Sequence, residues 1–276
     1  MAQIINTNLP SLNAQRNLSA TGSDLAQAVQ RLSSGLRVNS AKDDAAGLAI
    51  AERMSAQARG MTVAIRNAND GISMAQTAEG ALGQVSDMLQ RMRELAVQSM
   101  NATNGESDRA NLDAEFQQLA AEITRTIAGT QFNGLTILGA DAGTLTFQVG
   151  AGTTANDSLN VTSVDLSADA SVGAVTGGAV TDVTTATDAV NNIDAVLTTI
   201  NTERANWGAV QNRFEAVIGI LQVSAENQTA ARSRIMDADF AAETAALTRA
   251  QVLQQAGTAM LAQANQIPNS VLQLLR

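Results

Sequence analysis

The side chains that could do chemistry in this chain are almost all carboxylates, because the sequence contains no cysteine and no histidine. Thiolate and imidazole metal ligands, and nucleophiles that depend on cysteine or histidine, are therefore excluded. A metal or acid–base cluster could in principle be built from Asp43, Asp44, Asp237 and Asp239. These positions lie at predicted helix starts, where a carboxylate caps backbone N–H groups and suits the helix dipole. We expect capping there, and we expect no enzyme activity, metal site or cofactor.

The composition restricts the possible partners. The formal net charge is -9, whereas binding of nucleic-acid phosphates requires a surface rich in Lys and Arg. We therefore expect no nucleic-acid partner. No stretch approaches the roughly 18–20 apolar residues of a membrane span, so we expect no membrane partner. The segment 1–10 lacks the basic start and long apolar run of a cleavable signal peptide. Export, if it occurs, is expected to use a route without such a signal.

The two ends of the chain carry matching apolar stripes with alternating steps of four and three residues, the spacing of a coiled-coil seam. The C-terminal stripe comprises Leu253, Gly257, Met260, Ala264, Ile267, Val271 and Leu274. The N-terminal stripe comprises Leu18, Gly22, Leu25, Val29, Leu32 and Leu36. Neither stripe can bury itself alone. We therefore predict that the terminal helices pair with each other as a coiled coil.

Between the ends, the sequence predicts long helices. The first helix is expected over 11–33, followed by a turn at Gly35 and by a capping box formed by Ser40 and Asp43. No proline interrupts 42–101, and about sixty helical residues would span roughly 90 Å. A third helix follows a polar turn at 101–108, and helix returns near 185 with apolar positions spaced by sevens: Ile193, Ile200, Trp207, Phe214 and Leu221. The predicted fold is mainly α, an elongated rod of long antiparallel helices.

The region of about 130–184 has a different character. It contains no Lys or Arg and is rich in Thr, Ser, Val, Gly and Ala. Apolar and polar residues alternate around Leu145, Phe147 and Val149, and again around Leu159 and Val161. This alternation predicts one small β-hairpin flanked by irregular turns.

Several long segments resemble bacterial flagellin closely. They cover about 1–140 and 185–276, in the order of the family, and include RLSSGLRVNSAKDDAAGLAIAERM (31–54), IRNANDGISMAQTAEGAL (65–82), TQFNG (130–134), ARSRIMDADFAAET (231–244) and QVLQQAGTAMLAQANQIPNSVLQLL (251–275). The interval between the hairpin and the returning helix leaves no room for the extra outer domains of many flagellins. The chain therefore resembles a minimal flagellin.

The resemblance implies a structural subunit that polymerises through its terminal helices into the tubular filament used for swimming. It implies an inner-tube domain at 1–42 and 237–276 and a helical rod domain at 43–236 that includes the hairpin region. The terminal stripes are rich in Ala, Gly and Gln and bury little apolar surface in a monomer. We therefore expect self-assembly contacts at Leu18, Leu25, Val29, Leu32, Leu253, Met260, Ile267, Val271 and Leu274.

The resemblance also implies partners and a location. It implies other copies of the chain, a flagellar export chaperone, the filament cap and junction proteins, and an extracellular flagellum reached through type III export without a cleaved signal. A vertebrate Toll-like receptor that recognises flagellin is implied as well, with Arg91, Leu95 and Glu115 at the matching contact positions. From composition alone, the group around Arg91 is a solvated helix face.

Two other readings remain open from the residues alone. A hook–filament junction protein shares the terminal helices of flagellin, but usually matches DDAAGLAI and ANQ less closely. A secreted adhesin would bind a receptor without needing to polymerise. The tendency to form filaments separates these readings.

Overall fold

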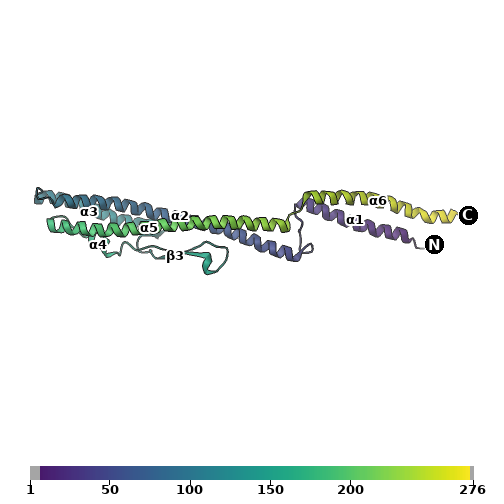
Figure 1. Cartoon of the computed structure of the whole chain (residues 1–276), viewed down its shortest axis with the longest axis horizontal. Coiled ribbons are helices and arrows are strands. Elements are labelled where there is room, and N and C mark those ends of the chain that lie inside the picture. Colours follow the sequence, from purple (N-terminus) through teal and green to yellow (C-terminus); the bar gives the residue numbers. More distant parts are fainter. Residues whose placement is uncertain (1–6, 274–276) are drawn as a thin grey trace. The chain divides into compact units, whose positions relative to one another are not determined.

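The computed structural model describes residues 7–273, and side-chain burial is described as far as residue 266. Most of this part of the chain is helical, as predicted (Figure 1). The elements are α1 (Leu9–Ser34), α2 (Ala45–Ser99), α3 (Glu106–Gly129), β1 (Gln131–Phe132), β2 (Leu135–Thr136), β3 (Thr144–Gln148), the short 3₁₀ helix η1 (Ala155–Asp157), β4 (Ser158–Thr162), α4 (Ala170–Thr176), α5 (Val183–Met236) and α6 (Phe240–Gln273). The fold is therefore mainly α with small antiparallel strand pairs.

The chain divides into two compact units, a terminal unit within Met1–Ala56 and Asn227–Arg276 and a central unit, Gln57–Glu226. The division falls inside α2 and α5, because both helices continue from one unit into the other. The predicted functional division at 42/43 and 236/237 instead follows the helix ends, and it stays a prediction.

The central unit contains three neighbouring helices. Two contacts show that α2 and α3 are antiparallel: Arg91 pairs with Glu115 (2.8 Å), and Arg109 donates to the carbonyl oxygen of Ser99 (2.9 Å). Helices α2 and α5 are antiparallel as well, because Arg93 pairs with Asp194 (2.8 Å) and Gln211 donates to Glu79 (2.8 Å). All five α5 residues predicted from the spacing of sevens are buried. Four of them, all except Leu221, pack in one core with the buried side chains of α2 and α3.

The predicted hairpin is confirmed. Strands β3 and β4 pair antiparallel, with Leu145 opposite Val161 and Phe147 opposite Leu159. Phe147 lies edge-on to Phe214 of α5, with ring centroids 5.3 Å apart. The prediction of irregular turns around a single hairpin was incomplete, because β1 and β2 form a second short pair and α4 forms a short helix. These elements are too short to leave a periodic pattern in the sequence.

One core position of α5 holds a carboxylate. Glu203 lies between Ile200 and Trp207 on the buried face and is only 6% exposed. Its carboxylate accepts a hydrogen bond from the side-chain amide of Asn206 (3.2 Å). Burial raises the pKa of the Glu203 carboxyl, and this hydrogen bond offsets part of the effect.

The position of Glu203 predicts a pH-dependent stability. Because the folded-state pKa is raised, the contribution of this group to stability is complete below the unfolded-state pKa of about 4.3. The contribution is lost as the pH rises through the folded-state pKa. We therefore expect Glu203→Gln to raise the urea midpoint at pH 7 and to change it little near pH 4. Fluorescence of Trp207, the single tryptophan, reports unfolding of the central unit. Glu226→Gln, at an exposed position of the same helix, is the control, and an equal effect of both changes would refute the prediction.

Candidate functional site: the paired terminal helices

In the terminal unit, α1 and α6 lie antiparallel along each other. Near the start of α1, the Asn8 side-chain amide donates to the carbonyl oxygen of Ala264 (2.8 Å). At the other end, Arg31 forms an ion pair with Glu243 (3.3 Å) in the first turn of α6. The prediction that the two ends of the chain meet as paired helices is therefore confirmed.

Small residues let the two helices approach closely. A Cβ added at Gly257 of α6 would lie 3.1 Å from Cδ1 of Leu18, a distance at which a neighbour must shift. Ala28, Ala250 and Ala264 are buried along the same contact. The pairing therefore relies on close backbone approach, and it buries few large side chains.

The connections at one end of the pair are held by backbone hydrogen bonds. Gly35 ends α1 with a left-handed conformation (φ 71°) that an L side chain rarely adopts. Leu36 then forms an antiparallel bridge with Asp237, and the Arg37 N–H donates to the carbonyl oxygen of Met236 (2.6 Å). These contacts join the end of α1 to the start of the C-terminal segment.

The predicted N-terminal seam departs from the structure only at Val29, since Gly22 and Leu36 are half-buried as predicted. Leu18, Leu25 and Leu32 are half-buried, as a seam residue would be. Val29 is 50% exposed, and the neighbouring Ala28 is buried in its place. At this one point the contact is therefore one residue earlier than predicted, because the close approach to α6 favours alanine over the larger valine.

The predicted seam on α6 is also correct only in part. Gly257 and Ala264 lie in the contact as predicted, but Leu253 and Met260 are 52% and 65% exposed. Leu261 is half-buried where Met260 was expected. The predicted residues Ile267 and Val271 lie beyond the described side chains, and Leu274 lies outside the described residues.

The exposed residues of the two predicted seams form apolar surface on both helices. Val29, Leu253 and Met260 are joined by other large apolar residues that the sequence prediction did not select: Leu9, Leu12, Phe240 and Val252. A search for apolar residues next to a four-three stripe, in addition to those within it, would have found Leu12 and Val252. The two helices pair through small residues and leave large apolar residues exposed to solvent. Exposed apolar surface of this kind is typical of a site of association with another protein.

The aspartates considered for chemistry act as caps and turn acceptors. Asp44 accepts from the Gly47 N–H (2.8 Å) at the start of α2, and Asp239 accepts from the Ala241 N–H (2.9 Å) at the start of α6. Capping is thus confirmed at these two positions. Asp237 accepts instead from the hydroxyl of Ser233 (2.6 Å).

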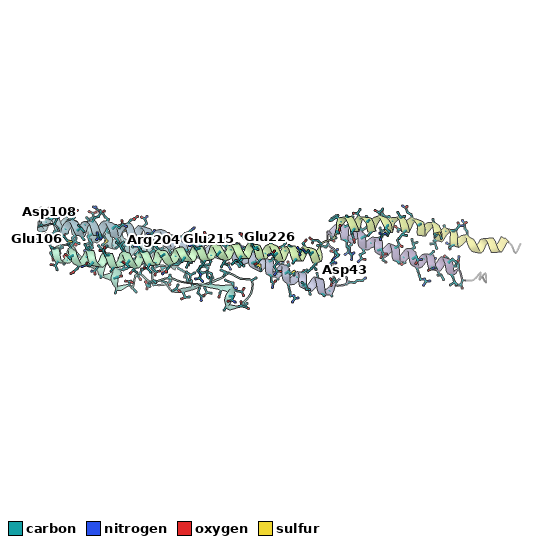
Figure 2. All side chains as sticks on the ribbon, in the orientation of Figure 1. Asp43, Glu106, Asp108, Arg204, Glu215 and Glu226 are labelled. Atoms are coloured by element: carbon teal, nitrogen blue, oxygen red, sulfur yellow. The ribbon has the colours of Figure 1, made fainter. Side chains whose placement is uncertain are left out.

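The predicted capping box at Ser40 and Asp43 forms a turn before α2, which begins later, at Ala45. Asp43 is labelled in Figure 2. The Ser40 hydroxyl and the N–H groups of Asn39 and Ser40 donate to Asp43 and lower the pKa of its carboxyl. The cap itself is supplied by Asp44, one residue after the acid of the predicted box.

The proposed receptor-contact positions lie on the central unit. Arg91 and Glu115 are both exposed and form an ion pair, and Arg91 also pairs with Glu94 (3.0 Å). Leu95 requires a correction, because it is 1% exposed and packs in the core. It follows Met92 on the buried face of α2, so it supports the helix from inside and cannot meet a partner as a surface residue would.

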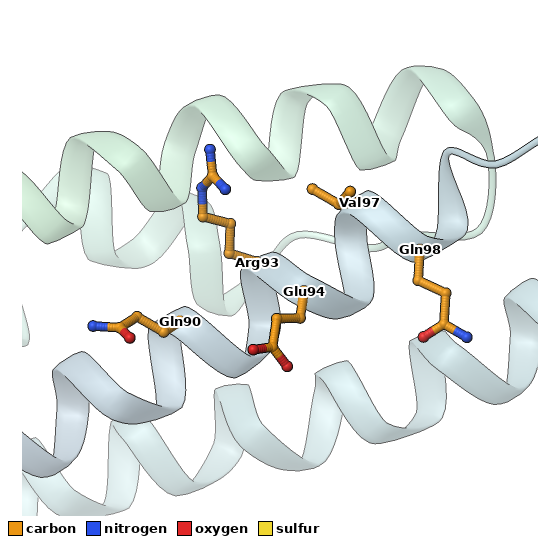
Figure 3. Close-up of a pocket in the computed structure, with 5 residues that line it drawn as sticks. All are labelled: Gln90, Arg93, Glu94, Val97 and Gln98. Atoms are coloured by element: carbon orange, nitrogen blue, oxygen red, sulfur yellow. The ribbon is translucent and has the colours of Figure 1, made fainter.

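A shallow hollow of about 490 Å³ lies beside these residues, lined by Gln90, Arg93, Glu94, Val97 and Gln98 of α2 (Figure 3). Arg93 points towards α5, in agreement with its ion pair to Asp194. Val97 contributes an exposed apolar side chain. The hollow combines charged, amide and apolar groups, which suits a protein contact better than a small-molecule site.

Comparison with known proteins agrees with this architecture. A family model of the bacterial flagellin N-terminal helical region matches residues 5–142, and a model of the bacterial flagellin C-terminal helical region matches residues 190–275. A flagellin of Halalkalibacterium halodurans is 51% identical over 273 residues, covering 99% of this chain and all of that protein.

Two further comparisons point the same way. The flagellar filament 33 kDa core protein of Treponema phagedenis is 41% identical over 288 residues, covering 99% of this chain and all of that protein. The crystal structure of Bacillus cereus flagellin matches with a TM-score of 0.50 and 31% identity, covering 60% of this chain and 94% of that one.

The paired helical termini and the apolar surface that they expose define a self-associating structural protein. The chain belongs to the bacterial flagellin family. It is a structural subunit of the extracellular flagellar filament and serves swimming motility, in a compact form without a large outer domain. The alternatives, a hook–filament junction protein and a secreted adhesin, are not favoured by this extent of identity to flagellins. No helix in the described part of the chain has the apolar run that crossing a membrane requires.

Proposed function

We propose that the terminal segments, 1–42 and 237–276, form the inner tube of the filament, and that 43–236 forms the outer rod with the hairpin region at its surface. The supporting observation is the exposure of Val29, Leu253 and Met260 on helices that are already paired within one chain. In a tubular lattice, each of these side chains would be covered by a neighbouring subunit. The half-buried Leu18, Leu25 and Leu32 hold the α1–α6 pair in the geometry that presents them.

Assembly tests this proposal directly. We expect the triple variant Val29→Ser, Leu253→Ser, Met260→Ser to stay monomeric at concentrations where the unchanged chain forms filaments. Burying each such side chain contributes about 1.5–3 kcal/mol, so losing three should raise the critical concentration by at least about 100-fold. The measurement is sedimentation and electron microscopy after addition of ammonium sulfate, which strengthens apolar association.

The hairpin region offers a matched control. Leu135, Val164 and Val183 are also exposed apolar residues, but they lie in the segment proposed to face outward. Changing all three to serine should leave the critical concentration nearly unaltered, and helical circular dichroism should confirm that both variants fold. Normal polymerisation of the terminal variant would refute the assignment of the inner contacts.

The remaining partners belong to the same proposal. An export chaperone would cover the exposed apolar face of α6 before assembly, since a monomer cannot cover it alone. Export would use the flagellar type III route without a cleaved signal peptide, and the cap and junction proteins would meet the ends of the filament. The exposed pair Arg91–Glu115 beside the hollow supports contact with a Toll-like receptor, for which Leu95 would supply packing only.

A further inference from the structure

The net charge of the chain is concentrated in one segment. Between 127 and 203 there is no Lys or Arg, and eight residues are acidic: Asp141, Asp157, Asp165, Asp169, Asp182, Asp188, Asp194 and Glu203. This segment therefore carries almost all of the formal charge of -9. Glu203 is buried and Asp194 is paired with Arg93, so most of the remaining negative charge lies around the strands and the turns that follow them.

The same segment contains a strand pair that no third strand covers. In the described part of the chain, β3 pairs only with β4. The inward side chains, such as Phe147 and Val161, pack against the core. The outward side chains form a polar ladder in which Thr146 donates to Asn160 (2.9 Å). A two-stranded pair has edges that no other strand occupies, and such edges are a template for pairing with strands of other molecules. At the end of β3 a helix contributes a contact, in which the side-chain amide of Asn67 of α2 donates to the carbonyl oxygen of Gln148 (2.9 Å).

Three aspartates flank this strand pair at both ends. Thr144 lies opposite Thr162 at one end of the pair, and Asp141 and Asp165 lie just beyond those residues. Asp157 lies at the other end and directly precedes β4. Negative charge therefore stands wherever a foreign strand would begin or finish pairing.

Local hydrogen bonds keep these aspartates ionised. Asp141 accepts from the N–H (3.0 Å) and hydroxyl (2.7 Å) of Thr136. Asp157 accepts likewise from Thr154 (2.9 and 2.6 Å). These donors lower the pKa of both carboxyls, and hydrogen bonds from Ser167 lower the pKa of Asp165. The charges therefore persist into mildly acidic conditions.

We propose that the aspartate border of the β3–β4 pair, Asp141, Asp157 and Asp165, prevents strand pairing between neighbouring filaments of this same protein. The inference rests on the proposed function, in which the hairpin region forms the filament surface. A filament repeats the hairpin many times, so even weak pairing between two filaments would be multiplied along their length. Like charges at both ends of every hairpin oppose that contact.

The three aspartates also stabilise turns, and the test must separate this role from repulsion. Asparagine retains a side-chain oxygen that accepts the same hydrogen bonds and is equally favoured in turns. The triple variant Asp141→Asn, Asp157→Asn, Asp165→Asn therefore removes three charges and leaves the turn acceptors. The control, Asp87→Asn, Glu215→Gln, Glu226→Gln, removes three charges from exposed helical positions; Glu215 and Glu226 are marked in Figure 2.

The experiment uses assembled filaments titrated with NaCl, with bundling followed by light scattering and inspected by electron microscopy. Because salt shortens the range of repulsion, from a Debye length of about 10 Å at 0.1 M to about 3 Å at 1 M, filaments of the unchanged chain should bundle only at high salt. We expect the hairpin variant to reach half-maximal scattering at a NaCl concentration at least about two-fold lower. The control should stay close to the unchanged chain.

Equal shifts in both variants would show that net charge alone matters and would overturn the inference, as would no shift in the hairpin variant. If the triple variant does not polymerise, filaments of the single variant Asp157→Asn are measured in the same way. The absence of a shift in this single variant would equally overturn the inference. Failure of the unchanged chain to polymerise would instead refute the proposed function, before any bundling is compared.

Discussion

Replacing Phe214 with alanine is expected to lower the free energy of unfolding of the central unit by about 3–5 kcal/mol. The ring is fully buried, and it contacts both the hairpin, through Phe147, and α2, through Gly71. Phe214 is one of only five phenylalanines in a chain with 2% aromatic residues. Removing the ring would leave a cavity where three elements meet.

Urea unfolding followed by Trp207 fluorescence measures this effect, and hydrogen exchange of the β3–β4 amides tests its local consequence. We expect exchange in the strands to accelerate more than exchange in α3, because Phe147 loses its edge-to-face partner. Ile220→Ala is the control on the same helix, since Ile220 is 67% exposed and surface changes usually stay within about 0.5 kcal/mol. A loss of less than about 1 kcal/mol in Phe214→Ala would contradict this account of the core.

The second large effect is expected at Gly71, where adding one methyl group should destabilise the protein. A Cβ at Gly71 would lie 2.5 Å from Cζ and 2.7 Å from Cε2 of Phe214. The ring is enclosed, so we expect overpacking to cost about 1–3 kcal/mol. This is opposite in sign to the usual gain from replacing glycine by alanine within a helix.

Gly80 on the same helix provides the matched comparison. A Cβ there meets nothing within 4 Å, so Gly80→Ala should stabilise the protein by about 1 kcal/mol through helix propensity. The two variants should therefore shift the urea midpoint in opposite directions. In the double variant Gly71→Ala, Phe214→Ala, the cost of the methyl group should largely disappear, because its clash partner is gone. Stabilisation by Gly71→Ala would show that the ring moves aside freely.

The long helices were predictable because their periodicity is strong and one face is buried in a continuous core. Ile193, Ile200, Trp207, Phe214 and Leu221 recur every seven residues, and all five are buried. The alternation around Phe147 likewise predicted a strand whose apolar side faces inward. These features depend on the local repeat of a helix or strand, which the sequence carries without knowledge of its partner.

The terminal site was predicted only in part. Of two adjacent residues, such as 28 and 29 or 260 and 261, a helical repeat of 3.6 residues does not tell which one faces the partner helix. The antiparallel contact of α1 with α6 decided that choice in favour of the small Ala28, and it left Val29 and Met260 exposed. The same limit applies to Leu95, whose burial depends on how α2 lies between α3 and α5.

The sequence by itself determined the helical class, the pairing of the two chain ends and the membership of the flagellin family, because periodicity and extended resemblance are properties of the chain alone. The tertiary structure decided which face of each terminal helix is covered within one subunit and which is left exposed. That outcome depends on the closest approach of two helical backbones, where glycine and alanine allow contact and where Val29, Leu253 and Met260 are left in solvent.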